Sequence, residues 1–219
     1  LTKAVVDSLF QSETQSQSAA GTTRMVAFIA DSLNAQSMAD EGSEEAKEDV
    51  DQDEGIMVDP VAEKARQERS ALREQFLDHL VDASKWASTS ATDDQRETDV
   101  EAVPKLSAST ITAVSRALSG VVSVPTECEA HCVSTSTDLI NIISAQQYSD
   151  DQSLDRSTGD TLFGVMSSVV DATLRRNATE FQEAGLAAEL KAIETVRSSI
   201  GTLGAAMMNN ALPDETPTN

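Results

Sequence analysis

Apolar side chains recur at spacings of three and four residues along most of this chain, the pattern of helices with one buried face. Two short helices are expected within residues 1–39. The first carries Val5, Val6, Leu9 and Phe10 on one side, and the second carries Met25, Phe28, Ile29 and Leu33 and fades near Met38. We therefore interpret residues 1–39 as an N-terminal helical pair.

Residues 40–59 interrupt this pattern. The stretch 40–54 is almost continuously acidic and has few apolar side chains, so it buries too little surface to offset the entropy of ordering. We therefore expect a mobile acidic linker. It ends at Asp59-Pro60, where Asp suits the N-cap and Pro suits the first position of a helix.

Residues 60–104 are predicted to form a charged helix and a Ser/Thr-rich loop. The apolar stripe of the helix consists of Leu72, Phe76, Leu77, Leu80 and Val81. Its first turns are charged on most sides, and the side chains expected to project into solvent are Glu63, Lys64, Arg66, Glu68 and Arg69. The loop is expected to begin at Ser84.

Residues 105–212 carry the strongest helical pattern. A helix with Ser107 or Ser109 as its N-cap is expected to end at Pro125, and its stripe is Ile111, Val114, Leu118, Val121 and Val122. Thr126-Glu127-Cys128-Glu129 then fits a capping box, which predicts that Thr126 caps the next helix. That helix carries Leu139, Ile140 and Ile143.

Two further helices complete this region. The first carries Leu162, Met166, Val169 and Val170 and is expected to end near Arg175-Arg176. The second is expected to bury one face formed by Leu186, Leu190, Ile193, Ile200, Leu203 and Met207. Residues 213–219 are read as an extended tail.

These patterns predict an all-α fold, because no segment alternates with a period of two. Short loops near residues 125, 150 and 177 favour antiparallel neighbours. We expect an up-down helical bundle over residues 105–212, with long acidic or polar loops. The first three helices either complete that bundle or form a satellite.

The charge of the chain narrows its partners. Its 219 residues carry a formal net charge of −21, which argues against nucleic acid or an anionic bilayer as a partner. No apolar run approaches the roughly 18 residues that span a bilayer, so no direct membrane insertion is expected. The chain begins at Leu1 without a signal-peptide pattern, and we expect a processed chain or a piece of a longer one.

Catalytic and metal-binding patterns are missing from the sequence. His79 and His131 lie in different segments, and His79 is expected to be partly exposed beside its apolar stripe. The acidic run beginning at Asp49 resembles the start of an EF-hand loop, but Glu54 stands where Gly is needed and Pro60 where the bidentate Glu is needed. We predict a protein without catalytic residues, cofactor or metal site, and at most weak Ca²⁺ association with residues 40–54.

Cys128 and Cys132 are the two cysteines of the chain. Zinc would need further ligands that other cysteines cannot supply. Cysteines four apart in a regular helix do not face each other, so a disulfide requires a distorted first turn, whereas two free thiols require a reducing compartment. Both alternatives stay open, and we favour a disulfide that stabilises the turn modestly.

Asn177-Ala178-Thr179 is an N-glycosylation sequon, which is meaningful if the chain passes through the secretory pathway. It falls between two helical patterns, where a glycan would reach solvent. We therefore predict glycosylation at Asn177, and this prediction favours the disulfide over free thiols.

Three stretches carry a family resemblance: ALSGVVSVP at 117–125, TSTDLINIIS at 135–144 and TGDTLFGVMSSVVDATL at 158–174. Their order resembles the helical extracellular region of the receptor-for-egg-jelly/polycystin family, which precedes the domain holding the autoproteolytic site. The resemblance covers about residues 65–217. The acidic stretch 40–54 and the cysteine pair have no counterpart in it, and the cleavage motif of the family is absent.

The resemblance implies a non-catalytic extracellular helical module of a large cell-surface or ciliary glycoprotein, or of a surface filament. Its implied partners are other domains of the same chain, neighbouring surface proteins, a polycystin-type channel or a filament. Its implied place is the extracellular face of the plasma or ciliary membrane, or an extracellular filament. The alternative is a cytosolic acidic scaffold or adaptor with free thiols and no glycan. An enzyme ranks third, and a pocket joining His79 or His131 to carboxylates would be its mark.

Overall fold

The computed structural model describes residues 5, 6, 8, 10, 19–45, 60–89, 106–146, 154–179 and 183–211. The regular elements in these ranges are helices, which confirms the all-α prediction. They are α2 (Ala19–Glu45), α3 (Pro60–Thr89), α4 (Ala108–Val122), the short 3₁₀ helix η1 (Pro125–Glu127), α5 (Ala130–Ser144), α6 (Arg156–Thr179) and α7 (Glu183–Ala211).

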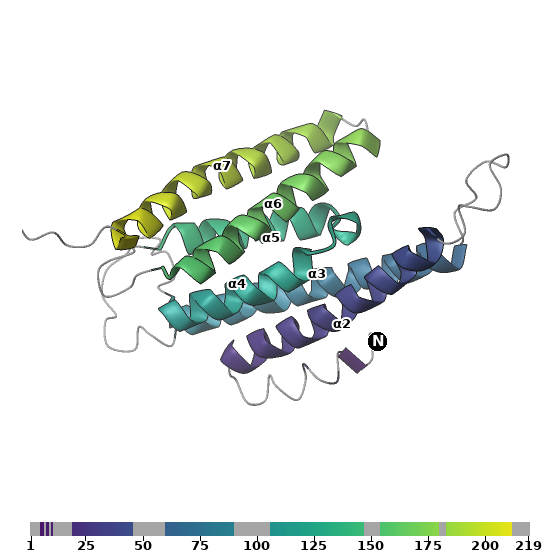
Figure 1. Ribbon diagram of the computed structural model, residues 1–219, viewed down its shortest axis with the longest axis horizontal. Helices are drawn as coiled ribbons and strands as arrows, with labels where there is room; N and C mark the ends of the chain where they lie inside the picture. The colour runs from purple at the N-terminus through teal and green to yellow at the C-terminus, as the bar shows by residue number, and fades with distance from the viewer. Residues whose placement is uncertain are drawn as a thin grey trace, which may run out of the picture.

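The long helices pack side by side as a bundle (Figure 1). Helix α2 packs against α3 and α4, α4 packs against α6, and α3 packs against α5. Helix α7 covers α5 and α6. In Figure 1, α2 and α7 therefore lie along opposite edges of the molecule, with the other four helices between them.

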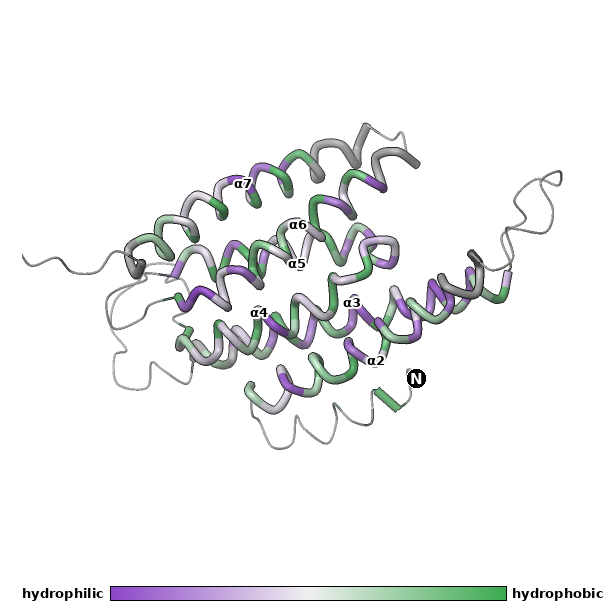
Figure 2. Tube along the Cα trace, in the orientation of Figure 1, coloured by the Kyte–Doolittle hydropathy of each residue, from purple (hydrophilic) through white to green (hydrophobic). Residues whose placement is uncertain are grey.

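One continuous apolar core runs through all of these helices. It begins at Val6 and Phe10 and reaches Leu203 on α7. Its largest fully buried apolar side chains are Phe76, Ile29, Leu33, Leu77, Leu80, Leu106, Leu118, Leu139, Ile140, Ile143 and Leu162. Figure 2 shows the hydrophobic positions recurring along each helix. Helices α2 and α3, together with Val6 and Phe10, thus share one core with the helices of residues 105–212, which answers a question that the sequence left open.

Several helices extend beyond the ends that the sequence predicts. Helix α2 continues past Met38 to Glu45, so the first residues of the expected linker are helical. Helix α3 continues past Ser84 to Thr89. The remainder of the acidic linker, residues 46–59, and the expected tail, 213–219, lie outside the described residues.

The buried face of α7 also differs from the expected one. Among its described side chains, residues 190–208, the buried ones are mostly small: Ala192, Val196, Ser199, Leu203 and Ala206. Leu190 and Ile200, both expected inside, are 58 % and 46 % exposed. The sequence interpretation assigned the larger apolar side chains to the buried face, whereas mostly smaller ones occupy it in the structure.

Candidate functional site

The turn between α4 and α5 begins where the sequence predicts, but its second half differs. Ser107 caps the N-terminus of α4 as predicted, and α4 ends at Val122 ahead of Pro125. The predicted capping box at Thr126 is wrong. Residues 125–127 form η1, and α5 begins only at Ala130, with Glu129 as an N-cap whose side chain makes no capping hydrogen bond.

Glu127, which the capping box would place in the first turn of α5, instead lies in η1 with its carboxylate in the interior. The side chain is only 2 % exposed. Its Oε1 accepts hydrogen bonds from Ser37 Oγ at 2.8 Å and Arg69 Nε at 2.6 Å. Its Oε2 accepts from Arg73 Nε at 2.8 Å. One carboxylate thus joins η1 to α2 and α3.

Arg73 is the innermost cation of this centre, with no exposed surface. Its Nη1 donates to the carbonyl of Val121 at 2.7 Å, and its Nη2 donates to Asn34 Oδ1 at 2.8 Å. Asn34 in turn donates from Nδ2 to the carbonyl of Gly120 at 3.0 Å. The carbonyl groups at the end of α4, which lack helical partners, are therefore satisfied by side chains from α2 and α3.

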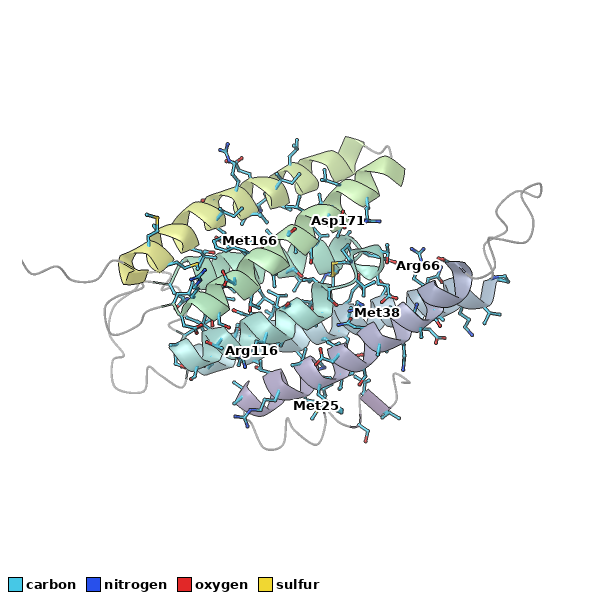
Figure 3. All side chains as sticks on the ribbon, in the orientation of Figure 1. Met25, Met38, Arg66, Arg116, Met166 and Asp171 are labelled. Atoms are coloured by element: carbon cyan, nitrogen blue, oxygen red, sulfur yellow. A yellow bond between two sulfur atoms is a disulfide. The ribbon has the colours of Figure 1, made fainter. Side chains whose placement is uncertain are left out.

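Arg69 forms the outer side of the same centre. Besides Glu127, it binds Asp40 of α2 through Nη1 at 2.6 Å. One turn earlier, Arg66 donates to the carbonyl of Thr126 at 3.4 Å, and Figure 3 labels this side chain at the end of the molecule where α2 and α3 meet the turn. We call Arg69, Arg73 and Glu127 the buried ion-pair centre.

The environment shifts the pKa of both arginines in this centre. Burial lowers the pKa of Arg73, and the Glu127 carboxylate only partly offsets that effect. Burial also acts to lower the pKa of Arg69, but the hydrogen bonds and charges of Glu127 and Asp40 together raise it. An arginine side chain stays protonated in proteins, so Arg69 and Arg73 both keep their positive charge. Both buried charges therefore depend on the negative charge of Glu127.

The sequence prediction that Arg69 projects into solvent is therefore wrong. Arg69, Arg73, Phe76 and Leu80 follow spacings of four, three and four, so the two arginines continue the stripe of Phe76 and Leu80. That spacing is a signal that sequence reasoning could have used. Their partner Glu127 lies more than 50 positions away, and the sequence carries no comparable signal for it.

The structure joins Cys128 and Cys132 by a disulfide directly beside Glu127. Cys128 lies in extended backbone just before α5, and Cys132 lies in its first turn, with 5.2 Å between the two Cα atoms. The helix start is thus displaced in the way that a bridge between cysteines four apart requires. Both side chains are buried.

The two histidines lie in separate settings. His131 Nε2 lies 3.1 Å from Asp78 Oδ1, and both side chains are exposed. His79 is partly exposed as predicted and stacks on Phe10, with 4.0 Å between ring centres. Close to His131, burial raises the pKa of Glu74, and the carboxylates of Glu129 and Asp78 add to that rise against the opposing effect of His131.

Asn177, the predicted glycosylation site, lies within α6 rather than between helices, because α6 continues to Thr179. The position of its side chain lies outside the described residues, as does most of the acidic stretch considered for Ca²⁺. Within the described residues, no group of three or more His, Cys, Asp or Glu side chains is arranged to hold a metal ion. The described helices include none that is long and apolar enough to cross a bilayer.

Comparison with known proteins gives no family: no family model, no curated protein and no solved structure matches this chain. The geometry of the buried ion-pair centre indicates its role. Its carboxylate and guanidinium groups bind one another and the end of α4, and so they stabilise a junction of four elements.

Proposed function

We propose that the chain is a non-catalytic extracellular helical module of a large polycystin-like cell-surface or ciliary glycoprotein. It acts through contacts with neighbouring domains or surface proteins. The observation that carries its extracellular setting is the Cys128–Cys132 disulfide, because such bonds persist in oxidising compartments. Its family setting is supported by the residue pattern of 117–125, 135–144 and 158–174 alone.

The contact function is supported by large apolar side chains on the two outer helices. Helix α7 exposes Leu190, Ile200 and Met208, and α2 exposes Phe28 and Met38. Exposed apolar groups of this size gain free energy when a partner covers them. Because α2 and α7 lie at opposite edges in Figure 1, such contacts would involve two sides of the module.

The non-catalytic character is supported by the use made of the buried charges. Glu127 and Arg73 reach the interior, but each is hydrogen-bonded to other parts of the chain. A catalytic acid, base or nucleophile must instead face a site that a substrate can enter. The buried ion-pair centre therefore supports a structural role.

A cytosolic acidic scaffold is the second candidate, and the net charge of −21 favours it. A surface of this charge attracts basic partners, and salt weakens that attraction. This candidate predicts free thiols in the cell and an unmodified Asn177.

Mass spectrometry of the protein isolated from its natural source separates the two candidates. The proposed function predicts a glycan on Asn177 and no free thiol at Cys128 or Cys132. Asn141, which lacks a sequon, serves as the unmodified control, and enzymatic deglycosylation should convert Asn177 to Asp. An unmodified Asn177 together with two free thiols would contradict the extracellular proposal and favour the scaffold.

A further inference from the structure

The segment from Thr126 to Glu129 has two local conformations available to it. Its sequence fits a capping box, in which Thr126 would be the N-cap and residues 127–129 would form the first turn of a longer α5. The structure contains the other conformation. Cys128 has φ −98° and ψ 95°, Glu129 has ψ −173°, and the amide of Val133 makes the hydrogen bond to Glu129 that starts the helix.

The disulfide is compatible with only one of these conformations. In a continuous α-helix, Cβ atoms four residues apart lie about 5–6 Å from each other, whereas a disulfide needs about 3.5–4.5 Å, so Cys128 and Cys132 could pair there only by distorting the helix. With Cys128 in extended backbone the two sulfurs meet, and their Cα atoms lie 5.2 Å apart. The bridge therefore excludes the longer helix.

The conformation of residues 128–129, extended or helical, also decides the position of Glu127. An extended residue advances about 3.3 Å and a helical residue about 1.5 Å, so converting Cys128 and Glu129 to helix would shorten this stretch by roughly 3–4 Å. It would also rotate Glu127 about the axis of α5. Glu127 could not then keep its hydrogen bonds of 2.6–2.8 Å to Arg69 and Arg73.

We infer that the Cys128–Cys132 disulfide is a conformational lock, which starts α5 at Ala130 and keeps Glu127 in the buried ion-pair centre. Reduction by a dithiol adds two electrons and two protons to the bridge, giving two thiols while the dithiol becomes a disulfide. The freed residues 127–129 then join α5 under the Thr126 cap, and Glu127 withdraws from Arg73. The lock concerns the conformations of the chain itself and does not depend on the proposed function.

Both sulfurs are buried, with Cys128 2 % and Cys132 0 % exposed. A dithiol therefore reaches the bridge only when the turn opens, and reduction of the folded protein is expected to be slow. Because these are the only two cysteines, a reductant changes no other bond in the chain. This makes the intact chain suitable for the test.

The test compares the oxidised chain with the dithiothreitol-reduced chain by nuclear magnetic resonance. Mass spectrometry verifies the reduction, because the reduced chain is heavier by two hydrogen atoms. The lock predicts that the Cα chemical shifts of residues 127–129 become helical on reduction. It also predicts that the Nε–H proton of Arg73, hydrogen-bonded to Glu127 in the oxidised chain, exchanges with solvent at least tenfold faster.

Two variants provide the controls. The double variant Cys128→Ala/Cys132→Ala should show the reduced spectrum without reductant. The variant Thr126→Ala removes the cap of the longer helix, so its reduced form should show a smaller helical shift at residues 127–129. Unchanged shifts and unchanged Arg73 exchange in the reduced chain would overturn the lock. Global unfolding on reduction would overturn it too, because the bridge would then stabilise the whole fold instead of selecting between two local conformations.

Discussion

Glu127 is a carboxylate whose burial is tolerated only because three donors surround it. Taking a charge out of water costs several kcal/mol, and removing one partner of a buried pair typically destabilises a protein by about 3–5 kcal/mol. The donors of Glu127 come from Ser37, Arg69 and Arg73, on two different helices. A change at this one residue therefore affects the contact among α2, α3 and η1.

Replacing Glu127 by Gln should lower the free energy of unfolding by about 3–5 kcal/mol, because Arg73 would keep its charge without a carboxylate beside it. The matched control is Glu129→Gln, two residues along on the exposed start of α5. That change should stay within about 0.5 kcal/mol. Urea denaturation measures both, and equal effects of the two substitutions would count against a buried ion pair at Glu127.

Glu74, unlike Glu127, is a carboxylate whose removal should stabilise the protein. Its pKa is raised, mainly by burial and then by the carboxylates of Glu129 and Asp78. The folded chain thus binds this proton more readily than the unfolded chain, and the ionised form of Glu74 destabilises the fold at neutral pH. Glu74→Gln should increase stability at pH 7, with an advantage that fades as the pH falls through the raised pKa. A less stable Gln variant at pH 7 would contradict this.

At the scale of single residues, the sequence could indicate which side chains face inward but not what they bind. The spacing of Arg69 and Arg73 with Phe76 was available in advance. The partner was not, because Glu127 belongs to a four-residue motif that fits a capping box equally well. Local preference and long-range pairing compete at this position, and in the structure the disulfide next to Glu127 accompanies its pairing with the two arginines.

At the scale of elements, α4 approaches α2 closely at Gly120. A Cβ atom placed on Gly120 would lie 3.2 Å from the Cβ atom of Ala30, whose methyl group cannot rotate away. The same region of α4 offers its last carbonyl groups to Asn34 and Arg73. The missing side chain at Gly120 therefore lets both the packing and the hydrogen bonds form.

Gly120→Ala should destabilise the protein by about 1 kcal/mol, since α2 must move away from α4 to admit the methyl group. The control is Gly164→Ala in α6, where the added Cβ would meet nothing within 4 Å. There the higher helix propensity of Ala should increase stability by about 0.5–1 kcal/mol. Thermal or urea denaturation of the pair should give effects of opposite sign, and two stabilising substitutions would contradict the close approach.

The start of α6 allows a second test. Asp155 Oδ1 accepts a hydrogen bond from the amide of Thr158 at 2.9 Å, and Oδ2 accepts one from its hydroxyl at 2.7 Å. These bonds lower the pKa of Asp155 below its ordinary value of 3.8. Asp155→Ala should cost about 1 kcal/mol at neutral pH, as expected for the loss of a helix cap.

The pH dependence of this cost follows from the lowered pKa. The contribution of Asp155 is fully present above the pKa of the unfolded chain and is lost as the pH falls through the lower, folded value. The stability difference between wild type and Asp155→Ala should therefore be constant above about pH 5 and shrink below the ordinary value of 3.8. A difference that persists unchanged at the lowest pH would exclude this cap.

Helix ends and buried faces account for the main errors of prediction at this scale. The sequence predicts the existence of each long helix, because apolar spacing records it directly. It places the end of α6 near Arg175, whereas the helix continues through Asn177 to Thr179. On α7 it favours Leu190 over Ala192, although the smaller side chain is the buried one. Both errors concern packing against a neighbour, which spacing along one helix does not contain.

At the scale of the whole molecule, the chain has a net charge of −21. Even so, two arginines pair with Glu127 where α2, α3 and η1 meet. Composition alone predicts a helical, acidic protein and says nothing of this interior. The single core from Val6 to Leu203 also exceeds what periodicity predicts, because periodicity does not show which helices share a core. Cooperative unfolding of the chain as one unit is the expected consequence.

The central claim is that Glu127 and Arg73 stabilise the fold as a pair. A double-mutant cycle tests it most directly, using urea denaturation of wild type, Glu127→Gln, Arg73→Met and the double variant. We predict strong coupling, with the double variant more stable than the sum of the single effects implies by at least about 1.5 kcal/mol, because Glu127→Gln no longer leaves Arg73 as a buried charge without a carboxylate. Arg69 keeps its ion pair with Asp40 in all four chains. Additive effects of the two substitutions would contradict the buried ion-pair centre.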